Sequence, residues 1–140
     1  MHDYHNILVA LDIYSDYQPV IERAHKLAKK PKDISLIHVT MPKVYFEPYG
    51  AAFESNFVED LQQQSDQKLN EIAAKYKVPA SQIHNIIGHP SVEIQQVAEK
   101  IKADLIVLGT HGRSGLSLLL GSTANAVLHG VKRDVLAVKV

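Results

Sequence analysis

At 140 residues the chain is long enough for a self-sufficient core, and we expect residues 1–140 to form one domain. Lys plus Arg and Asp plus Glu number 15 each, so the summed charge offers no general attraction to nucleic acid or an anionic membrane. The absence of cysteine excludes disulfides, thiolate metal sites and thiol catalysis. The N-terminal segment has no basic region and Asp12 interrupts its apolar run, so we expect a cytoplasmic protein without signal peptide or membrane span.

The first expected elements are a buried strand, a helix and a second strand. The continuous apolar run Asn6–Leu11 predicts a strand buried on both faces, and Asp12 follows it directly. Ser15–Asp16 offers caps for a helix that runs to about Lys30. The apolar segment Ile34–Val39 predicts the second strand.

Two polar features in this region are interpreted as structural. Lys26, Lys29 and Lys30 crowd the end of the first helix, where cations complement the helix dipole, so we interpret them as a solvated face. His38 lies inside the second strand. A single strand histidine is more typical of a hydrogen-bonded core or rim position than of a ligand.

The middle of the chain combines an irregular loop with a long helix. Met41–Phe53 contains two prolines, one glycine and four aromatic residues, which predicts either a lid or partner surface, or a loop that covers its own core. Glu54–Tyr76 has apolar residues at helical spacing and predicts a helix. The polar interval Gln62–Gln67 predicts that the middle of this helix is weakly anchored.

The second half repeats the alternation of strand and helix. Ser81–Ile87 predicts a short strand, and Ser91 is a candidate cap for a helix through about Lys102. Leu105–Leu108 is an uninterrupted apolar run and predicts another strand buried on both faces. The last strand is expected at Asp134–Val140.

A glycine-rich loop follows the Leu105–Leu108 strand. Gly109 ends the apolar run, and Gly112 and Gly121 let backbone approach a ligand closely. Ser122 is a good cap for a helix over Thr123–His129, whose first amides then point back at the loop. A strand, a glycine-rich loop and a capped helix start together predict a seat for an anion such as phosphate.

The alternation of elements predicts one parallel five-stranded sheet with helices on both faces. If the first strand lies beside the fourth, Asp12 and the Gly109 loop face each other at the carboxyl edge, where open α/β sheets bind ligands. The sequence has neither a P-loop nor a glycine fingerprint after its first strand. Ser114 lacks a complete nucleophile elbow, and the histidines show no metal-binding pair.

The whole chain resembles the universal stress proteins. The segments that carry the resemblance are N-I-L-V-A-L-D at Asn6–Asp12, S-L-I-H-V at Ser35–Val39, A-D-L-I-V-L-G-T-H-G-R-S-G-L at Ala103–Leu116, L-L-G-S-T-A at Leu119–Ala124 and D-V-L-A-V at Asp134–Val138. The resemblance implies a Rossmann-like domain of the adenine nucleotide alpha hydrolase type. It also implies a stress-response protein that binds ATP, with or without Mg²⁺, and signals by its bound state.

The resemblance further implies a nucleotide site. The residues expected to line the adenosine side are Ala10, Leu11, Asp12, Val39 and Leu108. Those expected to hold ribose and phosphates are Gly109, Gly112, Gly121, Ser122 and Thr123. Arg113 either adds positive charge near phosphate or is a solvated loop residue. ATP-binding members carry G-x2-G-x9-G-[ST], whereas only eight residues, Arg113–Leu120, separate the second and third glycines here.

The shortened loop leaves a second hypothesis open, a nucleotide-free dimeric interaction module of the same fold. A third, a nucleotidyl-transfer enzyme, is disfavoured because its loop motifs do not follow the first strand. No catalytic residue or metal ligand can be assigned, so any ATP hydrolysis should be slow. The strand Val135–Val140 is apolar on both faces at an expected sheet edge, which predicts a homodimer that buries Leu136, Val138 and Val140.

Overall fold

The computed structural model describes residues 4–41, 55–110 and 132–140, with the side chains of 55–58 left out. The elements in these residues are β1 (Ile7–Ala10), α1 (Gln18–Leu27), the 3-10 helix η1 (Pro31–Asp33), β2 (Ile34–Thr40), α3 (Ser55–Lys75), the 3-10 helix η3 (Ala80–Gln82), β3 (Ile83–Ile87), α4 (Pro90–Ile101), β4 (Leu105–Gly109) and β5 (Asp134–Val138). No helix among them is long and apolar enough to cross a membrane.

The five strands form one sheet in the order β3-β2-β1-β4-β5, and every neighbouring pair is parallel. β1 and β4 are buried along their whole lengths, as their uninterrupted apolar runs predicted. Ala10 is level with Ile37 of β2 on one side and with Leu108 of β4 on the other. The first strand therefore lies beside the fourth, which confirms the expected topology.

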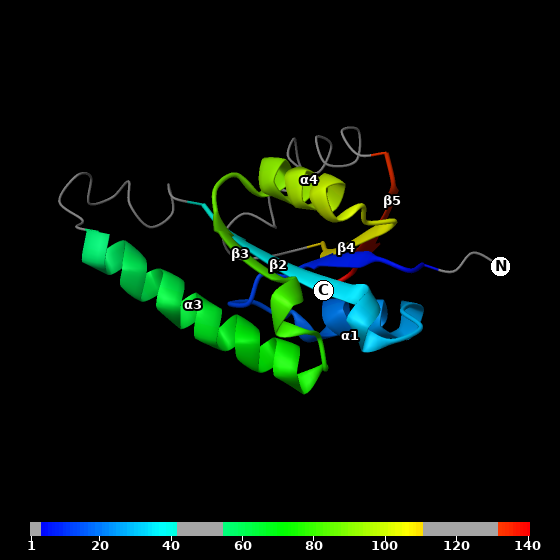
Figure 1. Ribbon diagram of the computed structural model, residues 1–140, viewed down its shortest axis with the longest axis horizontal. Coiled ribbons are helices and arrows are strands. Elements are labelled where there is room, and N and C mark those ends of the chain that lie inside the picture. The colour runs from blue at the N-terminus through cyan, green and yellow to red at the C-terminus, as the bar shows by residue number, and fades with distance from the viewer. Residues whose placement is uncertain (1–3, 42–54, 111–131) are drawn as a thin grey trace.

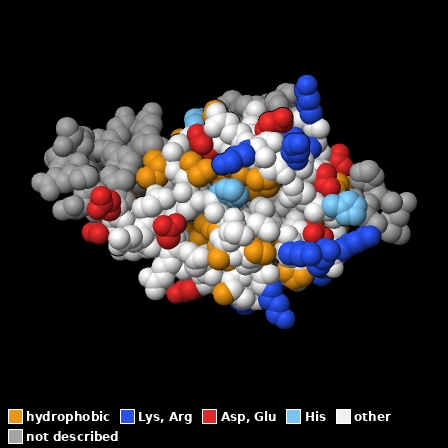
Figure 2. Space-filling view, in the orientation of Figure 1, with side chains coloured by type: hydrophobic (Ala, Val, Ile, Leu, Met, Phe, Trp, Pro, Cys, Tyr) orange, Lys and Arg blue, Asp and Glu red, His pale blue; other side chains and the backbone are white. Residues whose placement is uncertain are grey.

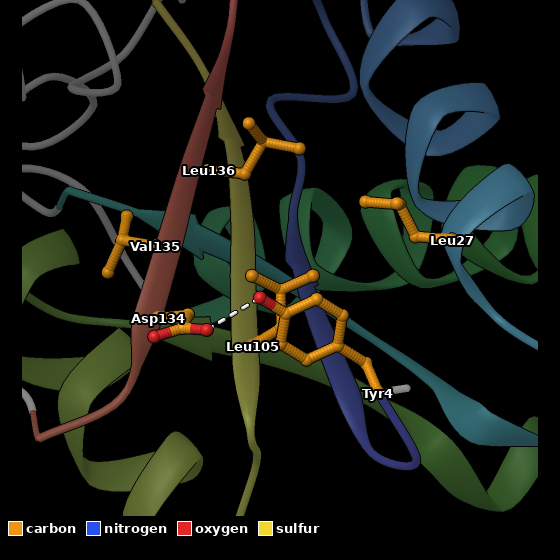
Figure 3. Close-up of a pocket in the computed structure, with 6 residues that line it drawn as sticks. All are labelled: Tyr4, Leu27, Leu105, Asp134, Val135 and Leu136. Carbon is orange, nitrogen blue, oxygen red and sulfur yellow. Dashed lines mark hydrogen bonds between the residues drawn. The ribbon is translucent and has the colours of Figure 1, made fainter. Parts of the chain in front are cut away.

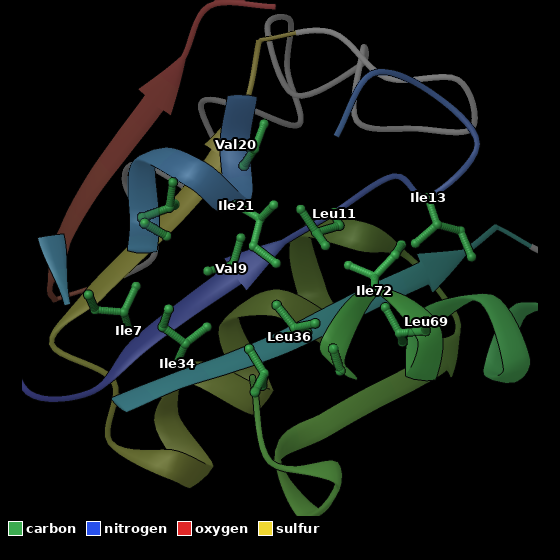
Figure 4. Close-up of a cluster of buried hydrophobic side chains, with 14 of the residues drawn as sticks. Ile7, Val9, Leu11, Ile13, Val20, Ile21, Ile34, Leu36, Leu69 and Ile72 are labelled. Atoms are coloured by element: carbon green, nitrogen blue, oxygen red, sulfur yellow. The ribbon is translucent and has the colours of Figure 1, made fainter. Parts of the chain in front are cut away.

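Helices cover both faces of the sheet (Figure 1). On one face α1 and α3 pack against alternate strand residues such as Val9 and Leu36, in a core that also includes Leu69 of α3 (Figure 4). On the other face α4 packs against the intervening residues, Leu8 and Ile106 among them. Each fully buried Leu or Ile side chain contributes about 1.5–3 kcal/mol of transfer free energy. The predicted α/β architecture is confirmed.

The helix starts differ from the predictions. α1 begins at Gln18 with Tyr17 as its N-cap and no side-chain cap bond, so the expected cap at Ser15–Asp16 is wrong. Ser15 instead donates its backbone N–H to the Asp12 carbonyl in the turn after β1. α4 begins at Pro90, one residue before the expected cap Ser91. In both helices a proline lies in the first turn, where its fixed φ favours helix initiation.

The end of α1 is also earlier than expected, at Leu27, because the chain becomes extended at Ala28. The lysines that follow are exposed, in agreement with a solvated face. Figure 2 shows Lys and Arg side chains gathered at this end of the molecule, over α1 and η1. The expected cap Ser122 and the helix Thr123–His129 lie outside the described residues.

The polar interval of α3 is anchored, contrary to the prediction. Gln62 Nε2 donates to the Asn85 carbonyl of β3 at 3.0 Å. The Asn85 amide donates to Ser65 Oγ at 2.8 Å and to Asp66 Oδ1 at 2.7 Å. Ser65 is 3% exposed, so this part of the helix is buried against the sheet by polar contacts. Apolar periodicity alone could not detect them.

The last strand is shorter than predicted and ends at Val138. Val138 is 5% exposed and belongs to the core on the α1 side of the sheet. Leu136 and Val140 are partly buried against the same core. The expectation that a partner copy buries Val138 is therefore wrong, because the chain buries this side chain itself.

Candidate functional site

The carboxyl edge of the sheet brings the described part of the predicted nucleotide site together. Ala10, at the end of β1, lies level with Ile37 on β2 and with Leu108 on β4, and Asp12, Val39 and Thr110 each follow two residues later along the chain. The predicted residues Ala10, Leu11, Asp12, Val39, Leu108 and Gly109 therefore lie on three adjacent strands or directly after them. The other five predicted residues, Gly112, Arg113, Gly121, Ser122 and Thr123, lie outside the described residues.

Asp12 is a buried acidic residue at this edge, and the turn after β1 holds it in place. Asp12 is 5% exposed, and its Oδ1 accepts the backbone N–H of Tyr14 at 3.1 Å. Its own carbonyl accepts the N–H of Ser15 at 3.1 Å. A side-chain oxygen that accepts an N–H two residues later is an Asx turn, and such a turn fixes the direction of the carboxylate. The turn therefore holds the carboxylate in a fixed direction at the carboxyl edge of the sheet.

His38 is packed beside this turn as a hydrogen-bonded core residue, as predicted. It is 2% exposed, and its Nδ1 lies 3.1 Å from the Leu11 carbonyl oxygen. A carbonyl can only accept, so Nδ1 carries a hydrogen. Nε2 lies 3.3 Å from the Thr40 hydroxyl, which donates to it when the ring is neutral. Burial lowers the pKa of His38 and so favours the neutral ring.

Two aromatic contacts hold Tyr14 of the same turn, one with His38 of β2 and one with Lys68 of α3. The Tyr14 ring packs edge-on against His38, with ring centroids 5.7 Å apart. Lys68 of α3 places its ammonium 5.3 Å from the centre of the Tyr14 ring, within cation–π range. Sequence analysis did not identify Tyr14 or Lys68, because neither belongs to a motif and their contact joins segments far apart in the chain. Of the expected lid Met41–Phe53, only Met41 is among the described residues.

A second candidate surface lies at the other end of β5. An open groove with a volume of about 390 Å³ lies between β5 and α1. Figure 3 shows the side chains that line it. Its lining residues are Tyr4, Leu27, Leu105, Asp134, Val135 and Leu136. Tyr4 donates its hydroxyl to Asp134 Oδ2 at 2.5 Å, and this bond raises the Tyr4 pKa. The groove is apolar apart from this pair, and Leu27 at its rim is 39% exposed.

Comparison with known proteins identifies the family of the chain and agrees with the fold. Residues 3–139 match the sequence model of the Universal stress protein family. The chain is 40% identical to Universal stress protein A homolog 2 of Coxiella burnetii, over all of this chain and 98% of that protein. It is 37% identical to Universal stress protein A homolog 1 of the same organism, over 99% and 97% of the two chains.

Solved structures give the same result. A hypothetical protein whose biochemical function was assigned from its structure superposes with a TM-score of 0.79 at 24% identity, over 99% and 98% of the chains, and supports the fold. A universal stress protein in complex with cAMP superposes with a TM-score of 0.62 at 25% identity, over 99% and 98% of the chains. On the match of its whole length, this chain belongs to the universal stress protein family.

Proposed function

We propose that this protein binds an adenine nucleotide at the carboxyl edge of its sheet and acts in the cytoplasm as a stress-response regulator. The observation that carries the proposal is that β1, which leads to Asp12, lies between β2, which carries Val39, and β4, which ends at Gly109 at the start of the glycine-rich loop. The cAMP complex of a related universal stress protein supports the ligand class. The proposed phosphate ligands are Gly109, Gly112, Arg113, Gly121, Ser122 and Thr123, and ATP is the proposed physiological nucleotide.

Asp12 is the proposed acceptor for a ribose hydroxyl or an adenine donor. Its Asx turn keeps the carboxylate in one direction before the ligand arrives, which lowers the ordering cost of binding. Asp12→Ala should weaken nucleotide binding by about 1–3 kcal/mol, because a buried donor loses its partner. Asp12→Asn is the matched control for the turn, since its amide oxygen can still accept the Tyr14 N–H.

Binding rather than turnover is the proposed activity. Both ring nitrogens of His38 are engaged in structural hydrogen bonds, so this residue is a poor candidate for a general base. Within the part of the chain that the structure describes, no group of three His, Asp or Glu residues could hold a metal ion. Any ATP hydrolysis by the proposed site should therefore be slow relative to nucleotide exchange.

Calorimetric titration with AMP, ADP and ATP, with and without Mg²⁺, tests the proposal. We expect saturable binding that Gly109→Val abolishes without unfolding the protein, because Gly109 is buried at the end of β4, where the backbone must approach the ligand. If the wild-type protein binds none of the three nucleotides, the nucleotide-free interaction module becomes the better hypothesis. The shortened glycine loop is the observation that favours that module.

We also propose a homodimer that pairs β5 with its own copy across a two-fold axis. β5 is the last strand in the sheet order. The N–H and C=O groups of its even-numbered residues point toward β4, because the Val138 carbonyl accepts the N–H of Thr110. The N–H and C=O groups of Val135 and Ala137 therefore point away from β4. The groove in Figure 3 lies between β5 and α1, and its mainly apolar lining adds surface that a partner could cover.

A further inference from the structure

Cations gather at one end of the fold, although the summed charge of the chain is zero. All strands of the sheet are parallel, so each helix runs back to the amino edge before the next strand begins. The links 28–33 and 76–82, which follow α1 and α3, therefore both lie at this edge. Their charged residues are Lys29, Lys30, Lys32, Asp33 and Lys77. The link 11–17 at the carboxyl edge is acidic by contrast, with Asp12 and Asp16.

Two hydrogen bonds join the links at the amino edge into one surface. His25 Nε2 lies 3.1 Å from the Tyr76 carbonyl oxygen, which brings the end of α1 beside the end of α3. Gln82 donates its side-chain amide to the Lys32 carbonyl at 2.9 Å, which brings η3 beside η1. Cations over α1 and η1 are visible together in Figure 2. We call the exposed side chains of this region the lysine surface, which consists of Lys26, Lys30, Lys32, Lys75 and Lys77.

The helix dipole accounts for part of this surface. Lys26 and Lys75 lie in the last turns of their helices, where a cation is stabilised by the helix carbonyls. Lys30, Lys32 and Lys77 lie beyond the helix ends, and none of the three forms an ion pair with another described residue. Neighbouring like charges repel one another, so an anion that covers the lysine surface would relieve this repulsion.

The apolar groove between β5 and α1 opens at the same edge. Leu27 lines it, next to Lys26 in the sequence, and is 39% exposed. Arg23 lies four residues before Leu27 in α1, so the two share one side of the helix, and Arg23 is exposed. The acidic group of the groove, Asp134, accepts the Tyr4 hydroxyl. An occupant of the groove therefore passes the cations of α1.

We infer that the amino end of the molecule binds an acidic protein segment that places one large apolar side chain in the groove and its carboxylates on the lysine surface. Charge complementarity selects the acidic segment. A phosphate backbone or a layer of lipid headgroups would also match the lysines, but it would leave the apolar groove empty. The surface lies at the opposite edge of the sheet from Asp12, so the inference does not depend on the proposed nucleotide function.

The probe is a labelled synthetic peptide of Asp and Glu residues with one central Phe, and fluorescence anisotropy measures its affinity. We expect saturable binding that weakens as the salt concentration rises, because exposed charges are screened. Replacing the Phe of the peptide by Ala should lower the affinity about tenfold, since an apolar contact is lost. Absence of binding at low salt would overturn the inference, and so would equal affinities of the two peptides.

Two charge-matched variants test the lysine surface. Lys30→Glu and Lys139→Glu change the net charge equally, and both positions are exposed, but Lys139 follows β5 at the carboxyl edge. We expect Lys30→Glu to weaken binding of the Phe peptide about fivefold and Lys139→Glu to leave it close to that of the wild type. Equal affinities of the two variants would mean that the peptide responds to net charge alone, which would reject the lysine surface.

Leu27→Ser tests the groove. We expect this variant to bind the Phe peptide about as weakly as the Ala peptide, and to bind the Ala peptide as the wild type does, which also shows that it is folded. A loss that is equal for both peptides would place the Phe elsewhere and overturn the inference.

Other occupants are tested by competition and sedimentation. We expect neither phosphatidylserine vesicles nor duplex DNA to displace the Phe peptide, and we expect Leu27→Ser to self-associate as the wild type does. Displacement by vesicles or DNA would assign the lysine surface to a phosphate-bearing partner instead. Loss of self-association in Leu27→Ser would assign the groove to a second copy of the chain. Either result would overturn the inference.

Discussion

The two edge strands of the sheet, β3 and β5, are both parallel strands of five residues, but their outward backbone groups have different surroundings. β3 is closed by a helix: its outward Asn85 carbonyl accepts Gln62 Nε2, and the Asn85 side chain bonds to α3 as well. β5 directs the backbone groups of Val135 and Ala137 outward, and an apolar groove lies beside it. An unpaired edge recruits other strands, so proteins block such edges or use them.

The comparison assigns different roles to polar side chains on the two sides of the molecule. At β3, the Gln62 side-chain amide of α3 donates to the outward Asn85 carbonyl, so this backbone group is not available to pair with a further strand. At β5 the described side chains leave the edge backbone accessible, which fits a self-complementary contact between copies. We therefore expect association through β5 and not through β3, and substitutions at each edge can test the difference.

The largest expected effect is the loss of the dimer in Ala137→Pro. Ala137 is exposed, and its N–H points away from β4, so proline removes an outward donor without breaking a ladder bond inside the chain. Sedimentation should show the variant as a monomer at concentrations where the wild type is a dimer. Ala137→Val is the matched control, since it keeps the donor and should still dimerise. A wild-type monomer at high concentration would reject the β5 contact.

The second largest effect is expected at the closed edge, in Asn85→Asp. The substitution keeps the shape of the side chain but replaces the amide donor with a carboxylate that faces the Asp66 carboxylate, now 2.7 Å from the Asn85 amide. We expect a loss of about 2–3 kcal/mol in the free energy of unfolding. Chemical denaturation measures it, with Asn70→Asp on the exposed side of α3 as the control. A loss no larger than that of the control would show that α3 does not depend on this contact.

The sequence predicted those parts of the fold that rest on apolar patterns. The runs in β1 and β4 predicted two buried strands, and the alternation of elements predicted one parallel sheet with Asp12 at its carboxyl edge; the structure adds that β1 lies beside β4. The polar contacts were not predictable in the same way. Gln62 stabilises α3 by reaching a strand 23 residues away, and no local periodicity encodes that partner.

The same distinction applies to the candidate site. Asp12 could be placed from its position after a buried strand, because strand order alone determines where it lies. The contact between His38 and the Leu11 carbonyl needs the register of two strands and one rotamer, and the sequence encodes these only through tertiary packing. The start of α1 was misplaced for a related reason. Ser15 has a side chain that can cap a helix, but in the structure its backbone N–H bonds to the Asp12 carbonyl in the turn after β1, and α1 begins after Tyr17.

A smaller effect is expected when the cap on the β3 edge is removed. Gln62→Leu keeps a side chain of similar size but removes the donor to the Asn85 carbonyl, which should cost about 0.5–1.5 kcal/mol of stability. Gln64→Leu, at an exposed position of the same helix, is the control for the added apolar surface. Denaturation curves for the two variants give the difference. If they coincide, Gln62 does not protect the edge.

The smallest effect is expected in Tyr4→Phe, at the amino end of the open edge. Tyr4 ties the segment before β1 to the first residue of β5 by donating its hydroxyl to Asp134, and the pair is exposed. That hydrogen bond, more than burial, raises the Tyr4 pKa above its ordinary value of 10.0. A pKa raised by folding stabilises the protein below the pKa of the unfolded chain, and the contribution disappears as the pH rises through the folded value. The melting temperatures of wild type and variant should therefore differ at about pH 8 and converge as the pH rises through the raised pKa of Tyr4 in the folded protein, above which the phenol is ionised in both states. Equal melting temperatures of wild type and variant at about pH 8 would mean that the ring, through its packing in the groove with Leu105 and Leu136, and not the hydroxyl, holds this end of β5 in place.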